Sequence, residues 1–466
     1  MEKAINNSNY IINVCENIQI LNGYLEMPQL LGIRIFNFKG LKDITLGKLR
    51  NNNAKPLTNL SVVIGKNGAG KSSIFEAFGF MSDCLKNGVE YACDVRGGFS
   101  KLISKGCDLT KSSITFVFYF KNNEDDNPIT YAVSIGQDQN TRPYVVQESL
   151  IQTDDEFIFQ DEHSLIMFFY NGRGVVWKEL STGKKIKSEI TYKDGLKLIN
   201  DVENWSNRVA EDLSVDEDNL DDAQIVNLED NRHLAITSLG AFKQHPRIVA
   251  FRKFIENWYL SYFSPDSARM LPLAGVQKHI SLHGENLANV VQYMQREHPD
   301  RFKTVLERIS SKIPGIEKID TETTSDGRLL LKFYSQGFEE PFYAQQMSDG
   351  TLKLFTYLLL LEDPEPYSLI CIEEPENGLY HKLLSMLACE FREYALRSNN
   401  KSQVFITTHQ PYLVNALDLD EVWILEKQAD GFSTISRASN NELVKNLADE
   451  GVELGSLWNS DYLDDN

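Results

Sequence analysis

The residues best suited to chemistry in this chain form a glycine-rich run from Gly65 to Ser72. The run reads Gly-Lys-Asn-Gly-Ala-Gly-Lys-Ser and matches the pattern GxxxxGK followed by Ser or Thr. Backbone N–H groups of such a loop can surround phosphate oxygens, Lys71 can neutralise them, and the Ser72 hydroxyl can hold Mg²⁺. The sequence therefore predicts a phosphate-binding loop. Its candidate nucleotide-binding residues are Gly65, Lys66, Asn67, Gly68, Ala69, Gly70, Lys71, Ser72 and Ser73.

Two adjacent carboxylates form a second candidate group. Glu373 and Glu374 directly follow the apolar run of residues 368–372, and the carboxyl end of a strand is where open α/β sheets bind ligands. Neighbouring strand residues point to opposite faces, so only one of the two can approach a metal from the side of Ser72. We expect Glu373 to contact Mg²⁺ through its water shell and Glu374 to polarise the attacking water during phosphate hydrolysis.

Two further polar motifs accompany these groups. Thr408 and His409 follow the apolar residues 404–407, which would place them beside the terminal phosphate, with His409 as a neutral hydrogen-bond partner or sensor. The run Ser348, Asp349, Gly350 and Thr351 precedes an amphipathic helix. Ser348 is a good N-cap, and such a turn presents backbone N–H groups to an anion.

These residues need strands and helices that bring them together. Short apolar runs at residues 31–36 and 60–64 predict buried strands. The apolar residues after Ser73 recur at helical spacing and predict a helix. Strand-like segments between about residues 85 and 200 indicate an antiparallel β-layer, and the pattern becomes helical from residue 234. Because the predicted site combines residues 65–73 with 348–409, the α/β core must be discontinuous.

Composition narrows the class of protein further. The chain has 466 residues, 42% of them hydrophobic, and a net charge of −19, so contact with nucleic acid would need a local basic patch. Eleven acidic residues between Asp201 and Asp230 predict an exposed insertion. The six cysteines form no CxxC pair, and no apolar run resembles a signal peptide or a membrane span, which indicates a cytoplasmic protein without membrane contact.

In combination, these motifs resemble those of the ABC-type ATPases that include the SMC, Rad50 and RecF proteins. Among them, the chain is most similar to the overcoming-lysogenization-defect (OLD) and related stand-alone AAA ATPases of bacterial antiphage defence. The resemblance rests on five segments in order: residues 33–41, the Walker A loop 65–72, the signature-like 348–351, the Walker B and D-loop run 372–379, and the switch histidine His409.

The resemblance implies an α/β fold, namely a P-loop ABC-type ATPase head with an antiparallel β-layer and an inserted helical lobe. It implies ATP and Mg²⁺ as cofactors and a homodimer or higher homo-oligomer. Two heads would sandwich ATP, with Ser348–Thr351 of one subunit closing on the γ-phosphate held by Lys71 of the other. The six regions expected are an N-terminal extension (1–27), a first ATPase half (28–200), the acidic insertion (201–233), a helical lobe (234–345), a second ATPase half (346–430) and a C-terminal tail (431–466).

The distances between the motifs along the chain distinguish among the ATPase groups that share them. Lys71 and Ser348 are 277 positions apart, more than a transporter ATPase needs, and the chain has no sustained heptads for SMC or Rad50 arms. Only about forty residues follow Leu425, too few for the TOPRIM nuclease domain of OLD proteins. We therefore expect ATP hydrolysis to control a separately encoded effector, a nuclease, as in the two-gene PARIS or Septu systems.

Two alternative functions stay open, and the chain differs from the usual family motifs at two places. The alternatives are a RecF-like DNA-repair ATPase and a nucleotide-gated sensor scaffold with slow turnover. Glu373 replaces the family's usual Walker B aspartate, and Tyr380-His381 replaces its usual His-Pro. Gln147 and Gln244 are both possible Q-loop glutamines, and the sequence does not choose between them.

Overall fold

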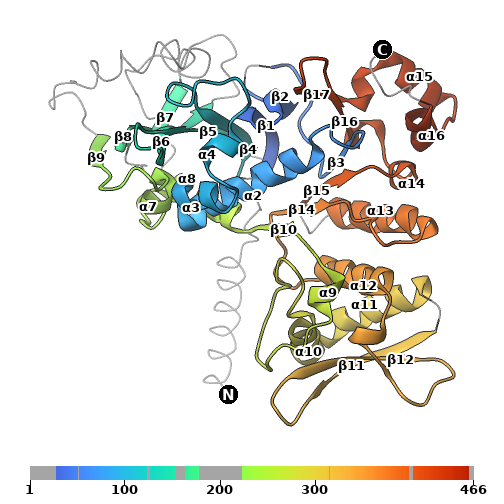
Figure 1. The fold of residues 1–466 in the computed structure, drawn as a ribbon. Helices are drawn as coiled ribbons and strands as arrows, with labels where there is room; N and C mark the ends of the chain where they lie inside the picture. The colour runs from blue at the N-terminus through green and yellow to red at the C-terminus, as the bar shows by residue number, and fades with distance from the viewer. Residues whose placement is uncertain are drawn as a thin grey trace, which may run out of the picture.

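The computed structural model describes residues 28–460 except 51, 123–125, 154–162, 178–222, 314 and 398–401. These residues form an upper lobe with two sheets and a lower lobe beneath it (Figure 1). The six-stranded sheet lies between two hydrophobic cores, because alternate residues of its strands enter one core or the other. The mixed α/β fold class expected from the sequence is confirmed.

The larger sheet has eight antiparallel strands in the order β2-β1-β4-β5-β6-β7-β8-β9. It confirms the expected antiparallel β-layer. Its last strand lies inside the segment 201–233 that was expected to be an exposed insertion, so residues 223–227 are instead part of the sheet, and residues 201–222 lie outside the described residues. The strands are β1 (Gln29–Phe38), β2 (Leu41–Gly47), β4 (Ile114–Lys121), β5 (Ile129–Gln137), β6 (Pro143–Thr153), β7 (His163–Tyr170), β8 (Arg173–Trp177) and β9 (Ala223–Asn227).

The smaller sheet has the order β10-β14-β15-β3-β16-β17, in which the first five strands are parallel and β17 is antiparallel. Strand β3, from the first half of the chain, lies between two strands of the second half, as a discontinuous core requires. Burial on both faces explains the continuous apolar runs in its sequence. The strands are β10 (Trp258–Ser261), β14 (Leu369–Glu373), β15 (Gln403–Thr408), β3 (Leu60–Ile64), β16 (Val422–Lys427) and β17 (Ser433–Arg437).

Helix α2 (Lys71–Asn87) follows the glycine-rich loop and runs between the two sheets (Figure 1). The Phe78 ring lies 5.1 Å from that of Phe405 in the parallel sheet, and the Phe80 ring lies 5.8 Å from that of Phe116 in the antiparallel sheet. Aromatic contacts on both sides hold this helix in place. The neighbouring helices are α3 (Val89–Asp94), α4 (Phe99–Leu102), α7 (Ala235–Leu239) and α8 (Pro246–Glu256).

The region 234–345, expected to be a helical lobe, is mixed. Strand β10 belongs to the parallel sheet, and three strands form a separate antiparallel sheet in the lower lobe. Alternating apolar residues on β12 bury one face of that sheet. The elements are α9 (Pro265–Ala268), α10 (Leu287–Glu297), α11 (Pro299–Lys312), β11 (Ile316–Thr323), β12 (Leu329–Ser335), β13 (Phe342–Tyr343) and the 3₁₀ helix η2 (Ala344–Gln346).

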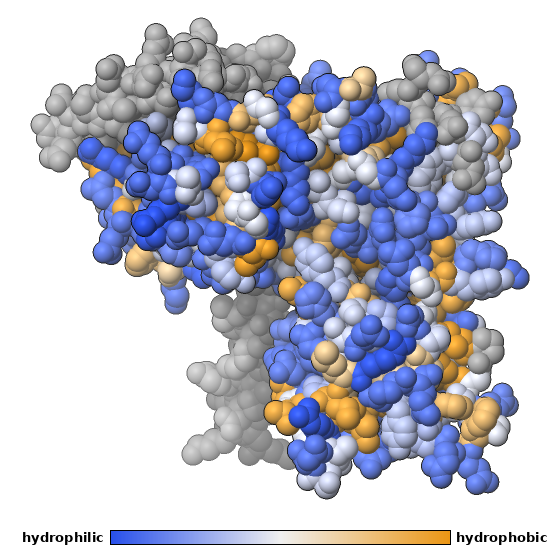
Figure 2. Space-filling model, in the orientation of Figure 1, coloured by the Kyte–Doolittle hydropathy of each residue, from blue (hydrophilic) through white to orange (hydrophobic). Residues whose placement is uncertain are grey.

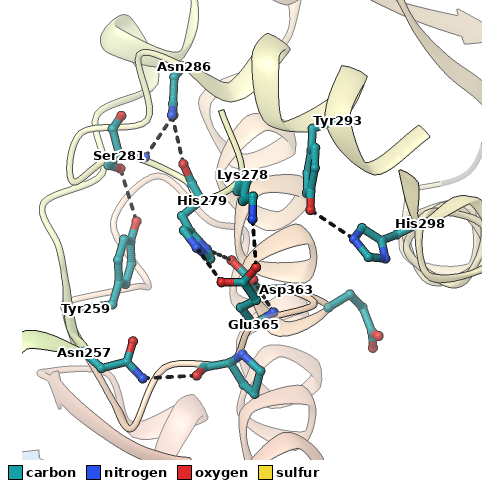
Figure 3. Close-up of polar contacts among 12 residues, drawn as sticks. Asn257, Tyr259, Lys278, His279, Ser281, Asn286, Tyr293, His298, Asp363 and Glu365 are labelled. Atoms are coloured by element: carbon teal, nitrogen blue, oxygen red, sulfur yellow. Dashed lines mark hydrogen bonds and ion pairs between the residues drawn. The ribbon is translucent and has the colours of Figure 1, made fainter. Parts of the chain in front are cut away.

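Helix α12 (Asp349–Leu361) begins at the signature-like turn and is anchored beyond its other end by a polar network (Figure 3). The Nδ1 atom of His279 lies 2.8 Å from Oδ2 of the buried Asp363, and Nζ of Lys278 donates to Oε1 of Glu365 over 3.1 Å. Burial raises the pKa of Asp363, and His279 opposes that shift. The network ties the end of α12 to the loop that precedes α10.

The remaining elements complete the second half of the chain. Among the described helices, none is long and apolar enough to cross a membrane. Figure 2 shows hydrophilic residues mixed with smaller hydrophobic areas over the visible face of both lobes. The elements are α13 (His381–Leu396), α14 (Pro411–Val414), η3 (Leu419–Glu421), η4 (Ala438–Asn440), α15 (Glu442–Asp449) and α16 (Leu454–Asn459).

Candidate functional site

The predicted site residues meet at one edge of the parallel sheet. Strand register pairs Glu373 of β14 with Thr407 of β15, and Thr408 with Ile64 of β3. The paired glutamates, His409 and the glycine-rich loop therefore all leave the sheet at the carboxyl ends of neighbouring strands. That edge is where open α/β sheets bind ligands.

The glycine-rich loop has a shape that only glycine permits at two positions. A Cβ atom on Gly65 would lie 2.4 Å from the carbonyl oxygen of Leu425, and Gly70 has a φ of +105° at the N-cap of α2. The hydroxyl of Ser433 on β17 donates to the carbonyl oxygen of Ala69 over 2.6 Å. These contacts fix the loop against β16 and β17.

Lys71 lies inside this loop and is 5% exposed. Its Nζ atom donates to the carbonyl oxygen of Gly65 over 2.8 Å. Burial lowers the pKa of Lys71, and the nearby carboxylates Glu374, Glu376 and Glu373 act in the opposite direction. The charge of Lys71 therefore interacts with the three carboxylates of residues 373–376.

Glu374 departs from the strand that precedes it. Its φ of +42° lies in the left-handed region, which is uncommon for a residue with a side chain. Its N–H donates to the carbonyl oxygen of Thr407 over 2.9 Å. Its Oε2 atom accepts from Nδ2 of Asn377 over 3.1 Å. These two bonds hold the carboxylate at the sheet edge, and a conformation of this kind is retained only where surrounding contacts impose it.

Glu376, a residue that the sequence motifs did not assign to the site, is 4% exposed. Its Oε1 atom accepts from Oγ1 of Thr408 over 2.8 Å and from the backbone N–H of His409 over 2.9 Å. The Nδ1 atom of His409 lies 3.1 Å from the same oxygen and 3.4 Å from Oε1 of Glu374. Glu376 thus holds the polar residues at the end of β15 beside the glutamates. The available signal was a third carboxylate in the same short run, after Pro375.

The signature-like turn occupies a different position. The Oγ atom of Ser348 accepts from the backbone N–H of Thr351 over 3.2 Å, which makes Ser348 the N-cap of α12 as predicted. A Cβ atom on Gly350 would lie 2.9 Å from the carbonyl oxygen of Gly378. The turn therefore packs against Gly378, near the end of the run 372–379, whereas Glu374 and Glu376 from the middle of that run form the cluster at the sheet edge with Lys71 and His409.

The residues at this edge suit a nucleotide with a magnesium ion. No group of three or more His, Cys, Asp or Glu side chains that could hold a metal occurs within the described part of the chain. A P-loop site does not need one, because a hydroxyl, a carboxylate and phosphate oxygens supply the hard oxygen ligands that Mg²⁺ prefers. Ser72 is exposed on the first turn of α2, and Glu373 ends strand β14.

The two glutamines considered for a Q-loop lie on other elements. Gln147 pairs with Ser134 and Tyr170 inside the antiparallel sheet. The Nε2 atom of Gln244 lies 3.2 Å from Nε2 of His245 in the connection between α7 and α8. Neither of these contacts involves the loop or the carboxylate run.

A glycine loop between a buried parallel strand and a helix, with acidic residues at the end of another strand of the sheet, is the arrangement of a P-loop domain of the AAA ATPase class. The chain belongs to the family described as "AAA domain, putative AbiEii toxin, Type IV TA system", whose model matches residues 60–415. That range contains every residue of the candidate site.

Solved structures with a similar arrangement include SMC head domains. An SmcHead bound to the C-winged helix domain of ScpA has 14% identity and a TM-score of 0.48, covering 87% of this chain and 96% of that one. A Pyrococcus furiosus Smc head with an extended coiled coil, bound to the C-terminal domain of ScpA, has 14% identity and a TM-score of 0.45, covering 91% and 100%. The Thermotoga maritima SMC head domain has 13% identity and a TM-score of 0.40, covering 88% and 98%. No curated protein matches the chain.

Proposed function

We propose that this chain is a Mg²⁺-dependent ATPase that hydrolyses ATP between two heads and thereby controls a partner effector, a nuclease, in antiphage defence. The observation that carries the ATPase proposal is the convergence of the Lys71 loop, Glu374 and His409 at one edge of the parallel sheet, where the strands that precede them are neighbours and Glu376 contacts His409. Family membership supports the same activity.

Each residue at the edge has a distinct role in this proposal. The loop residues 65–73 bind the phosphates, with Lys71 on the β- and γ-phosphate oxygens. Ser72 and Glu373 hold Mg²⁺, which neutralises charge on the transferred phosphoryl group. Glu374 orients and polarises the attacking water, and His409 donates or accepts a hydrogen bond near the γ-phosphate.

The proposed dimer completes the site from a second copy of the chain. Ser348–Thr351 begins α12 with a capped turn, and helix N-termini favour negative charge. Because this turn packs on Gly378, beyond the carboxylates of its own subunit, we assign it to nucleotide bound by another subunit and not to the glycine loop of its own. A twofold arrangement would give two such sites.

The effector is the part of the proposal that rests on the resemblance of the motifs to stand-alone defence ATPases. Closure and opening of the dimer would be the output passed to the nuclease. A second candidate function, a RecF-like DNA-binding ATPase, is favoured by the distribution of charge. Residues 28–121 contain 14 Lys and Arg but 6 Asp and Glu, against a net charge of −19 for the whole chain, and such a basic region suits phosphate backbones.

Phosphate release from ATP by the purified chain tests the enzyme proposal. Turnover is expected to require Mg²⁺, to be lost in Lys71→Ala together with ATP binding, and to fall about 100- to 1000-fold in Glu374→Gln with ATP binding retained. Glu393→Gln, on the exposed face of α13, is the matched control and should keep the parent rate. Equal ATP affinity in Lys71→Ala and the parent chain would refute the assigned loop.

The effector proposal needs a second measurement. The chain is co-expressed with the product of the neighbouring gene, and nuclease activity and phage resistance are compared for the parent and Glu374→Gln. Loss of the output in the variant supports control by hydrolysis. An intact output without turnover favours the nucleotide-gated sensor, and hydrolysis that rises steeply with duplex DNA at low salt favours the RecF-like ATPase.

A further inference from the structure

Arg269 contacts the signature-like turn from a distant part of the sequence. Its Nη2 atom donates to the carbonyl oxygen of Met347 over 2.8 Å and forms an ion pair with Asp349. Its Nη1 atom donates to Oδ1 of Asp266 over 3.0 Å, and its own carbonyl oxygen accepts from Nε2 of Gln345. The guanidinium group therefore holds the chain on both sides of Ser348, and its side chain is 21% exposed.

The segment before Arg269 leads directly to the nucleotide sheet. Strand β10 pairs in parallel with β14, so that Ser261 lies beside Ile372, the residue before Glu373. Eight residues after the end of β10, the chain reaches Arg269 through α9, whose N-cap Ser264 accepts from the backbone N–H of Ser267. A short, capped connection thus joins the neighbour of the carboxylate-bearing strand to the guanidinium group.

We propose that Arg269 is a positioning residue that sets the Ser348–Thr351 turn in the orientation needed to meet nucleotide on the partner subunit. This inference rests on the proposed dimeric ATPase and names a residue outside its motifs. Two ends of α12 are then fixed independently: the N-terminal turn by Arg269 and the segment after its C-terminal end by the His279–Asp363 contact (Figure 3). A turn that is already held in one conformation loses less conformational entropy when the two heads associate.

The first test separates positioning from folding by kinetics. Arg269→Ala should leave ATP affinity of the subunit within about twofold and lower kcat about 10- to 100-fold, because small displacements of a catalytic contact have effects of that size. Arg269→Lys, which keeps the charge but loses the two-pronged donor geometry, should have an intermediate rate. Arg328→Ala is the matched control: Nη1 of Arg328 donates to the carbonyl oxygen of Leu271 over 2.8 Å in the adjoining segment.

The second test uses mixed subunits, since the proposed role acts in trans. Arg269→Ala subunits have an intact loop, and Lys71→Ala subunits have an intact turn, so a mixed dimer contains one complete site. Equal amounts of the two impaired variants should recover about a quarter of the parent rate if subunits exchange randomly and the sites act independently. Ser348→Arg mixed with Lys71→Ala is the positive control for the dimeric site.

The outcomes distinguish this inference from the proposed function. Recovery in both mixtures supports Arg269 as a positioning residue. Recovery in the Ser348→Arg mixture alone overturns the role of Arg269 and leaves the dimeric ATPase standing. Absence of recovery in both mixtures overturns the dimeric site and, with it, the inference. A loss of rate in Arg328→Ala equal to that in Arg269→Ala also overturns the inference, because the effect would then be general to the lobe.

Discussion

The Nζ atom of Lys353 donates a hydrogen bond to the carbonyl oxygen of Asn377 over 2.9 Å. The same atom lies 3.4 Å from the carbonyl oxygen of Glu374. Lys353 is on α12, shortly after Ser348, so this contact joins the helix of the signature-like turn to the segment that bears the proposed catalytic glutamate. Burial lowers the pKa of Lys353, and Glu376 and Glu374 oppose that shift.

Replacing Lys353 should uncouple these two segments. Lys353→Met preserves the buried aliphatic volume but removes the donor, so we expect kcat to fall about tenfold or more while ATP affinity of the subunit stays near that of the parent. Single-turnover and steady-state phosphate release, with ATP binding measured separately, check this. An unchanged kcat in a folded Lys353→Met variant would contradict it.

Glu376 is expected to matter for both stability and turnover. Glu376→Ala leaves the Thr408 hydroxyl and the His409 N–H without their acceptor, which should reduce the free energy of unfolding by about 2–4 kcal/mol. Glu376→Gln retains one acceptor oxygen and should cost less. Urea unfolding of the three proteins checks the order, and equal stability of the Ala variant and the parent would be inconsistent with it.

Ser348→Arg tests closure of the two heads. A bulky cation at the N-cap removes the Oγ acceptor of Thr351 N–H and fills the surface that would meet a second subunit. We expect ATP to bind the variant monomer as it binds the parent, whereas ATP-dependent dimerisation and hydrolysis are lost. Light scattering with and without ATP measures dimerisation. Undiminished hydrolysis would exclude the dimeric site.

Glu148 on β6 predicts a pH dependence of stability. Its carboxyl group accepts from the backbone N–H groups of Ala235 and Ile236 and from the hydroxyl of Tyr131, yet burial raises its pKa from 4.5 to about 7. The folded protein therefore binds more protons than the unfolded chain between these values, so stability falls as pH rises through that window and changes little above it.

The Glu148→Gln variant supplies the reference for this measurement. At about 1.4 kcal/mol per pKa unit, the parent should lose about 3 kcal/mol relative to Glu148→Gln between pH 4.5 and 7. Chemical unfolding of both proteins across this range gives the difference. A constant difference would show that the carboxyl group has the same pKa in the folded and unfolded chain.

The phosphate-binding loop and the paired glutamates were predictable because the residues of each motif are contiguous in the sequence. The loop from Gly65 to Ser72 and the pair Glu373-Glu374 each follow a buried strand directly, and a parallel sheet aligns the ends of its strands at one edge. The antiparallel layer was predictable for a similar reason, since short runs of β-branched and aromatic residues separated by polar turn residues predict buried strands, and β4 and β5 are buried along almost their whole length. The α/β class and the discontinuous core followed from these patterns.

The predictions were incomplete where contacts join distant segments. Residues 223–227 were expected in an insertion but form an edge strand, because ladder pairing with β8 depends on a neighbour that the local acidic composition does not reveal. Residues 234–345 were expected to be helical but include strands that complete two different sheets. Local patterns do not show which sheet a short strand joins.

The sequence by itself therefore determined the phosphate loop, the strand-end carboxylates and the family motifs, whose identity depends on residue type and local order. Only the tertiary structure decided that Glu376 holds His409 and that Lys353 joins Asn377. It alone placed Arg269 on Asp349, 80 positions away. Such contacts depend on how packed strands and helices bring separate segments together. The sequence around a polar side chain does not indicate which distant residue it contacts after folding.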